Sequence, residues 1–325
     1  MLLDYKTPLT QARIGQRKRL KKLGTIKTNT VESTPIVLDG KLFRFEWVRT
    51  KQWSNAGGVE RQVGYYQIVD METELPLTMF GLNHSFGCCY VEDEKVYVHG
   101  VRGEGGGHII DCFWGSDLTH WKSGLGQKHW KASVALTLPD DIQIYNTSVC
   151  KGDGRYIMAI EIGGKNPAVG RAFTCVFAES SDLIHWSMLD MMEYSYSRER
   201  YTACPCIRYV DGFYYMIYLE GAPCHRWIPY IVRSKDLKNF ELGITNPIMW
   251  PDDSDKQVIH PERFTAEELD SIEYAVNCNN SDFDLCEYNG KTVITYSWGN
   301  QYGKEFLALA EYEGSNEEFL KSFFE

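Results

Sequence analysis

Short apolar runs separated by turn dipeptides follow one another along most of the chain. The stretch from Tyr145 to Trp186 shows the unit: an apolar run, Asp153-Gly154, a second apolar run ending at Glu161, and a third run. Asp-Gly between two short apolar runs predicts a β-hairpin, because both turn residues must tolerate positive φ. The third run ends in Asp-Leu-Ile-His-Trp, which predicts a turn with an aromatic anchor. The unit is therefore expected to form an antiparallel sheet of three or four strands.

The hairpin signal occurs five times, at intervals of 54 to 78 residues. The turns are expected at Asp39-Gly40, Asp93-Glu94, Asp153-Gly154, Asp211-Gly212 and Asn289-Gly290. The ending of the third run recurs at residues 116–121 and 234–240. Periodic units of four strands are typical of a β-propeller. The predicted fold class is all-β, a five-bladed β-propeller over residues 30–312.

Two helices are expected outside this repeat. Residues 8–23 are basic and are predicted to form a helix, with Pro8 near its first turn and Gly24 near its end. Residues 251–277 interrupt the repeat between the fourth and fifth blades, where Thr265 and Glu268 have the spacing of a capping box. The predicted domains are a basic helix and linker over 1–29 and a catalytic propeller domain over 30–325.

The predicted N-terminal helix needs a surface to pack against. Its Ile14, Leu20 and Leu23 cannot bury one another in a lone helix. We therefore expect the helix to dock either on the propeller wall or on a partner subunit, which would form a homodimer.

Composition narrows the classes of partner. The chain has 325 residues, 43% of them hydrophobic, and a net charge of −10. A core of ordinary size is expected, and the lack of a basic stripe beyond the N-terminal segment argues against nucleic acid. No stretch approaches the roughly 20 apolar residues of a membrane span, and residues 1–6 lack the apolar region expected of a secretory signal. The expected location is the cytoplasm.

The ten cysteines are expected to be reduced thiols. Cys88 and Cys89 are adjacent, and Cys204 and Cys206 share one strand, so neither pair has the spacing of a zinc site. Free cysteine in an apolar strand behaves as a small hydrophobic residue. No metal ligand and no cofactor are predicted, although a structural divalent cation on the propeller axis stays an open alternative.

Polar residues at particular strand ends are the candidates for chemistry. In a propeller, the starts of the innermost strands and the ends of the second strands surround one funnel. Glu161 and Glu220 each end an apolar run, where a buried carboxylate is costly unless it is paired or used. For each of them a structural ion pair, with Arg208 or Arg226, is the alternative. His84 and His99 have the alternative of a structural role.

Carboxylates that face one another across a pocket are what glycoside hydrolysis requires. The predicted catalytic residues are Glu220 as acid, Asp282 as base or pKa modulator, and Glu32 as the alternative base. Desolvation after an apolar strand should raise the pKa of Glu220, whereas Asn and Ser donors should keep Asp282 ionised. The residues predicted to bind substrate are Glu46, His84, Asn146, Glu161, Arg200, Tyr201, Asn280 and Trp298.

The repeating unit resembles the five-bladed propellers of glycoside hydrolase family 43 and of its relatives, families 32, 68 and 117. The family 43 pattern of two Asp and one Glu maps onto positions near Glu32, onto Asn146 and onto Ala203, so its triad is not intact here. Family 117 is similar in drawing on its last blade, where Asn280 and Asp282 lie, and in using an N-terminal helical segment in dimers.

The resemblance implies an exo-acting, inverting glycoside hydrolase with an oligosaccharide substrate. Two alternatives remain at this point. One is a glycan-binding propeller without catalysis. The other is a glycoside phosphorylase, for which Arg200, His225 and Arg226 are the candidate phosphate ligands.

Overall fold

The computed structural model describes residues 20–53, 60–120, 129–170 and 173–325, in which β-strands predominate. The first sheet contains β2 (Ser33–Leu38), β3 (Lys41–Trp53), β4 (Glu60–Asp70) and β5 (Pro76–Phe80). The second contains β6 (His84–Glu92), β7 (Lys95–Arg102), β8 (Ile109–Ser116) and β9 (Lys131–Thr137). The third contains β10 (Ile142–Gly152), β11 (Arg155–Gly164), β12 (Thr174–Ser180), β13 (Ser187–Met188) and β14 (Ser195–Tyr196).

The remaining eight strands form one sheet with two antiparallel halves. One half contains β15 (Thr202–Val210), β16 (Phe213–Ala222), β17 (Arg226–Ser234) and β18 (Phe240–Leu242). The other contains β19 (Asn279–Tyr288), β20 (Lys291–Gly299), β21 (Glu305–Tyr312) and β1 (Lys21–Thr28). A single parallel pair, Trp227 with Asn279, joins the halves.

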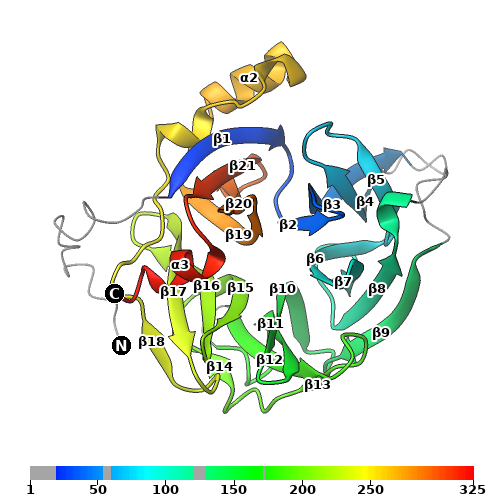
Figure 1. Cartoon of the computed structure of the whole chain (residues 1–325), viewed down its shortest axis with the longest axis vertical. Coiled ribbons are helices and arrows are strands. Elements are labelled where there is room, and N and C mark those ends of the chain that lie inside the picture. Colours follow the sequence, from blue (N-terminus) through cyan, green and yellow to red (C-terminus); the bar gives the residue numbers. More distant parts are fainter. Residues whose placement is uncertain (1–19, 54–59, 121–128, 171–172) are drawn as a thin grey trace.

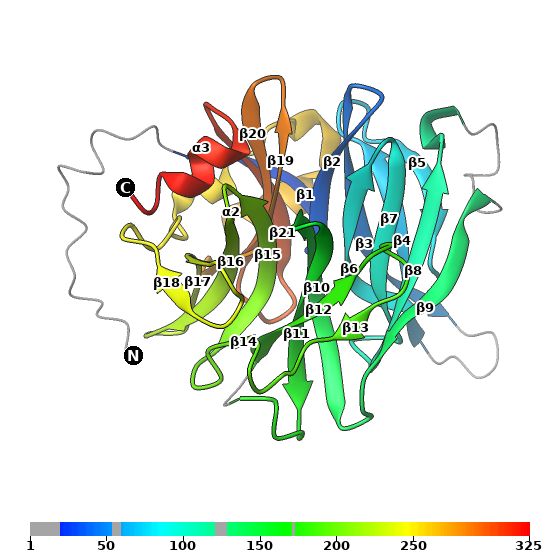
Figure 2. The ribbon, with the colours of Figure 1, turned by 60° about the horizontal axis from the view of Figure 1, so that its bottom comes forward.

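The sheets are arranged around a central axis like the blades of a propeller (Figure 1). The strands β2, β6, β10, β15 and β19 face this axis, and each contacts the next around a closed ring. In the side view, β2, β15 and β19 run along the axis (Figure 2). Apolar side chains fill the spaces between sheets; Phe45 and Tyr66, for example, are fully buried.

The five predicted hairpins are confirmed. In each, an axial strand pairs antiparallel with the next strand in sequence. Both turn residues have positive φ, as at Asp153 (φ 50) and Gly154 (φ 74). Glycine, aspartate and asparagine tolerate this conformation, which matches the turn to the twist of the strands.

The capping box predicted around Thr265 is also confirmed. The Thr265 hydroxyl accepts a hydrogen bond from the Glu268 N–H, and the Glu268 carboxylate accepts one from the Thr265 N–H. The helix that follows, α2 (Ala266–Glu273), lies between β18 and β19 in sequence. The other helices are α3 (Asn316–Lys321) and the 3-10 turns η1 (Leu118–His120), η3 (Asp253–Lys256) and η4 (Pro261–Arg263).

The N-terminal prediction is wrong where the structure tests it. Residues 21–23 belong to β1, which pairs antiparallel with β21 and so joins the sheet that contains the end of the chain. Residues 8–19 of the predicted helix lie outside the described residues. Lys22, one of the basic residues of the predicted helix, lies on β1; its ammonium is nearly buried and is 2.8 Å from the Asp255 carboxylate. The predicted boundary at residue 30 therefore leaves a strand of the sheet outside its domain.

In the part of the chain that the structure describes, no helix is long and apolar enough to cross a membrane.

Candidate active site

A cavity of about 350 Å³ opens at one end of the central axis. A smaller cavity of about 30 Å³, which we call the axial waist, shares part of its wall. Four residues line both spaces: Glu32, Asn146, Cys204 and Asp282. They lie on or just before four of the axial strands, so the ring of strands brings together residues 250 positions apart.

Irregular pairing aims several of these side chains at the axis. The register shifts in β6, β15 and β19, and the first extra residue of each bulge has positive φ: Phe86 (φ 52), Cys204 (φ 47) and Asp282 (φ 50). All three line the cavity. A bulge interrupts the alternation of a strand and redirects a side chain. Each strained residue costs on the order of 1–3 kcal/mol, which is typical of functional sites.

Glu32 and Asp282 form a pair of interacting carboxyl groups in this cavity. Burial and then the charge of Asp282 raise the pKa of Glu32 well above its ordinary value. Burial also raises the pKa of Asp282, while hydrogen bonds from Cys204 and Ser281 oppose the shift. Because those donors favour the charged form of Asp282, we assign the shared proton at neutral pH to Glu32.

Glu161 is the third carboxyl group of the cavity and is buried, at 4% exposure. Its Oε2 accepts hydrogen bonds from the Cys204 N–H at 2.7 Å and from Nδ2 of Asn146 at 3.0 Å. Burial raises the pKa of Glu161 to about 7 in spite of these donors. A carboxyl group with such a pKa can give up or take a proton at neutral pH.

A fourth carboxylate, Glu305, faces the same cavity beside Arg49. Burial raises the pKa of Glu305, and the Arg49 guanidinium, 3.3 Å from its carboxylate, opposes the shift. Among the described residues that line the cavity, Arg49 is the one cation. Neither residue was predicted, because Glu305 begins a third strand and Arg49 lies beyond the expected end of a second strand.

An arc of aromatic rings lines another part of the cavity. Ring centroids are 4.8 Å apart for Trp47 and Phe86, 5.5 Å for Phe86 and Tyr145, and 5.1 Å for Tyr145 and Phe173. Phe173 and Tyr201 continue the arc at 5.2 Å. Aromatic rings offer large rigid apolar surface for a ligand with apolar faces. Only Tyr201 of this arc was predicted from the sequence.

The prediction that Glu220 and Asp282 face one pocket is wrong. On β16 it is Leu219 that lines the cavity, and successive side chains of a strand point to opposite faces. Glu220 lies instead against Tyr218, whose hydroxyl donates to it at 3.1 Å, and Arg200, at 3.5 Å. Arg200 is likewise absent from the cavity wall. Burial raises the pKa of Glu220, as predicted, but at a site away from the axis.

Glu46, another predicted ligand, forms structural ion pairs and does not line the cavity. It is fully buried and accepts hydrogen bonds from Arg44 at 2.5 Å, Lys27 at 2.6 Å and Gln67 at 2.6 Å. Burial alone would raise the pKa of Glu46, but Arg44 and Lys27 lower it to about 2. The strand-end carboxylate in the first sheet is therefore satisfied by neighbours on β1, β3 and β4.

Three other predicted ligands lie outside the cavity. His84 contacts the Asp111 carboxylate at 2.8 Å. Nδ2 of Asn280 donates to Asp255 at 3.2 Å, and Nε1 of the fully buried Trp298 donates to the Thr25 hydroxyl at 2.8 Å. These side chains stabilise the packing of loops and of β1. Of the eleven residues predicted for the site, the cavity thus contains Glu32, Asn146, Glu161, Tyr201 and Asp282.

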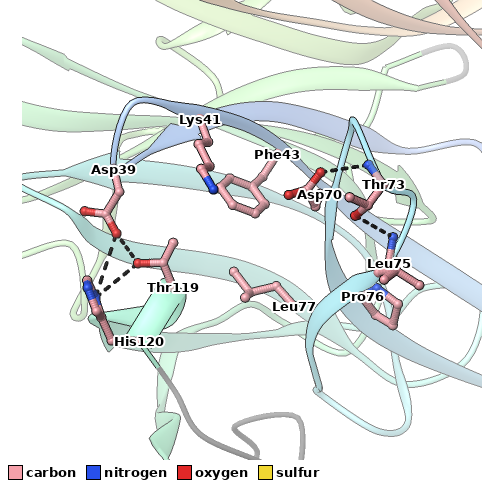
Figure 3. A pocket seen from close by; sticks show the side chains of 10 residues that line it. All are labelled: Asp39, Lys41, Phe43, Asp70, Thr73, Leu75, Pro76, Leu77, Thr119 and His120. Carbon is pink, nitrogen blue, oxygen red and sulfur yellow. Dashed lines mark hydrogen bonds and ion pairs between the residues drawn. The ribbon is translucent and has the colours of Figure 1, made fainter.

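A larger cavity of about 560 Å³ lies away from the axis, between the β2–β3 turn and η1 (Figure 3). Its acidic side chains are bound locally: Asp70 accepts hydrogen bonds from the Glu72 and Thr73 N–H groups, and Asp39 accepts one from Thr119. Local hydrogen bonds thus hold both carboxylates, so its size alone does not make this cavity a reactive site. Nowhere in the described ranges do three or more His, Cys, Asp or Glu side chains form a group that could hold a metal ion.

Comparison with known proteins shows similarity in structure but not in sequence. No family model and no curated protein matches the chain. An α-L-arabinofuranosidase from Podospora anserina, solved with cellotriose, aligns with a TM-score of 0.56 at 10% identity, covering 92% of this chain and 98% of its own.

Two other solved structures align over most of their length. For an α-L-arabinofuranosidase from Clostridium thermocellum the TM-score is 0.50 at 12% identity, with 82% of this chain and 81% of that chain covered. For a structure from the GH130 family of mannoside phosphorylases, which contains glycoside hydrolases that target β-1,2 mannosidic linkages in Candida mannan, it is 0.53 at 14% identity, with 87% and 84% covered. At these identities the likeness concerns architecture. The chain has the β-propeller fold of the propeller glycoside hydrolases.

Proposed function

We propose that this protein is an exo-acting, inverting glycoside hydrolase that binds the end of an oligosaccharide in the axial cavity. One observation carries the proposal: three carboxyl groups with raised pKa values line one cavity, the buried Glu32 and Glu161 and the half-buried Asp282. Hydrolysis of a glycoside needs one carboxylic acid and one carboxylate on opposite sides of the scissile bond. A raised pKa keeps the acid protonated near neutral pH.

Asp282 is the better base and Glu161 the better acid. Asp282 lines both the cavity and the axial waist, whereas Glu161 lines only the cavity. In the proposed reaction a water oxygen attacks the anomeric carbon and its proton passes to Asp282. The bond from that carbon to the leaving oxygen breaks, and Glu161 gives its proton to that oxygen. Glu32 retains its proton and modulates the pKa of Asp282.

The shape of the site favours exo action. The cavity holds about 350 Å³ and the axial waist beside it only about 30 Å³, so a chain end fits where a continuous polysaccharide would have to pass through the protein. The aromatic arc from Trp47 to Tyr201 offers the apolar surface for the sugar ring.

We also assign the two antiparallel halves of the eight-stranded sheet to separate blades, which makes the propeller five-bladed.

Phosphorolysis is the weaker candidate. Arg200, a candidate phosphate ligand in the sequence, lies against Glu220 away from the cavity. The described cavity wall carries four acidic residues and one arginine, a charge balance that opposes a phosphate dianion. Binding without catalysis would leave the cost of two buried carboxyl groups, Glu32 and Glu161, unexplained.

The test is a screen of aryl glycosides and of algal and plant oligosaccharides, with and without phosphate. Glu161→Gln and Asp282→Asn should each lower kcat at least about 100-fold, because proton transfer contributes roughly 10²–10⁴-fold in rate. Glu220→Gln is the matched control and should stay within a few-fold of the native kcat. NMR of the first product should show the inverted anomer. Native turnover in both site variants would place the chemistry elsewhere.

A further inference from the structure

The axial waist is a small polar space below the carboxyl groups. Its volume of about 30 Å³ exceeds the roughly 10–15 Å³ that one buried water needs. Glu32, Ser33 and Asp282 are among the residues that line it. The space is therefore large enough for one or two waters and too small for any part of a sugar ring.

Two buried polar atoms in this wall lack a partner among the described residues. They are Oε2 of Glu32 and Oγ of Ser33, in side chains that belong to residues 8% and 5% exposed. Buried polar atoms without a hydrogen bond cost free energy, and native proteins satisfy most of them with protein groups or ordered water. The carbonyl oxygen of Ser33 accepts a hydrogen bond from the Thr295 hydroxyl at 2.8 Å, which holds this backbone in place.

These groups have complementary hydrogen-bonding capacities. A protonated Glu32 can donate, the Ser33 hydroxyl can do both, and an ionised Asp282 can only accept. A water molecule that accepts from Glu32 and donates to Ser33 Oγ and to Asp282 would satisfy all three groups and keep one lone pair free. Two to four polar partners are what a buried water requires.

We propose that the axial waist binds one ordered water between Glu32, Ser33 and Asp282, that this water is the nucleophile of hydrolysis, and that Ser33 is its positioning residue. The catalytic part rests on the proposed function. The water oxygen attacks the anomeric carbon from the waist, its proton passes to Asp282, and the glycosidic bond breaks on the far side, where Glu161 protonates the leaving oxygen. Attack from the waist on a sugar in the wider cavity gives inversion.

Two substitutions distinguish the contribution of the Ser33 hydroxyl group from that of the space beside it. Ser33→Val should fill the waist with a methyl group and lower kcat at least about 100-fold, with KM within about threefold of native. Ser33→Ala removes one hydrogen bond but leaves the space, so kcat should fall by about tenfold or less. Thermal unfolding checks that both variants fold, and Ser33→Thr, which adds one methyl group, replaces Ser33→Val if that variant does not.

High-resolution crystal structures give a second measurement that does not depend on activity. We expect density for a water within hydrogen-bonding distance of Ser33 Oγ and the Asp282 carboxylate in the native protein, and none in Ser33→Val. Native protein without that density, or native kcat in a folded Ser33→Val, would overturn the inference while leaving glycoside hydrolysis intact. Failure of the proposed function would be seen in a different experiment: the native protein would cleave no glycoside in the screen.

Discussion

At the scale of single residues, proton binding by Glu161 couples the site to folding. Its pKa is about 7 in the folded protein against an ordinary value of 4.5. The folded state therefore holds this proton more tightly, and the resulting stability is full below about pH 4.5 and is lost as the pH rises through about 7.

Glu161→Gln removes this linkage and keeps a similar shape. Between pH 4.5 and pH 8, the free energy of unfolding of the native protein should fall relative to that of the variant by on the order of 3 kcal/mol. Urea unfolding of both proteins at the two pH values measures the difference. A difference that stays constant across this range would contradict the raised pKa.

The same assignment predicts a bell-shaped pH profile. Glu161 must be protonated and Asp282 ionised, so kcat/KM should fall above about pH 7 as the acid loses its proton. The acidic limb should lie above the ordinary range of an aspartate, because burial raises the pKa of Asp282. Initial rates on an aryl glycoside with a poor leaving group measure both limbs. Activity that rises without a maximum up to pH 9 would exclude Glu161 as the acid.

At the scale of elements, β1 depends on one glycine. Gly24 has φ +117, and a Cβ placed there would lie 2.3 Å from the carbonyl oxygen of Gln257. Gly24→Ala should therefore lower the free energy of unfolding by well over about 1 kcal/mol.

Gly40→Ala is the matched control for this substitution. Gly40 also has positive φ (+69), but nothing lies within 4 Å of a Cβ built there. Chemical unfolding should show a clearly smaller loss for Gly40→Ala, since it carries the backbone strain without the clash. Equal losses would mean that the close approach of β1 to the loop at Gln257 contributes nothing.

At the scale of the whole molecule, β1 closes the ring of sheets. It pairs with β21, a strand nearly 300 residues later in the chain. Its Thr25 hydroxyl accepts a hydrogen bond from Trp298. Deletion of residues 1–28 should expose the edge of β21 and lower the melting temperature by at least about 5 °C. Deletion of residues 1–19 keeps β1 and should leave the melting temperature close to native. Similar melting temperatures for the two truncations would contradict a closing role for β1.

The shorter truncation also tests the proposed homodimer. If the basic N-terminal segment holds two subunits together, sedimentation should give a dimer mass for the full chain and a monomer mass without residues 1–19. A monomer mass for the full chain would dispose of that proposal.

The conformational preferences of the turn residues determined the repeating antiparallel sheets. Residues such as Asp153 and Gly154 accept positive φ, and Thr265 with Glu268 completes a capping box, because these preferences act over a few residues. The same periodicity placed Glu32, Asn146 and Asp282 at the starts of axial strands, where they line the cavity.

Tertiary structure decided the rest, because it depends on contacts between distant segments. Glu161 and Glu220 look equivalent in sequence, but the register of each strand puts Glu161 against the bulge at Cys204 and turns Glu220 toward Tyr218. Arg49 and Glu305 meet only when the ring closes. The segment 21–28 became a strand because β21 offered it an open edge, which no local propensity encodes. The sequence alone thus determined the repeating sheets, while bulges, register and ring closure decided which carboxyl groups share the cavity.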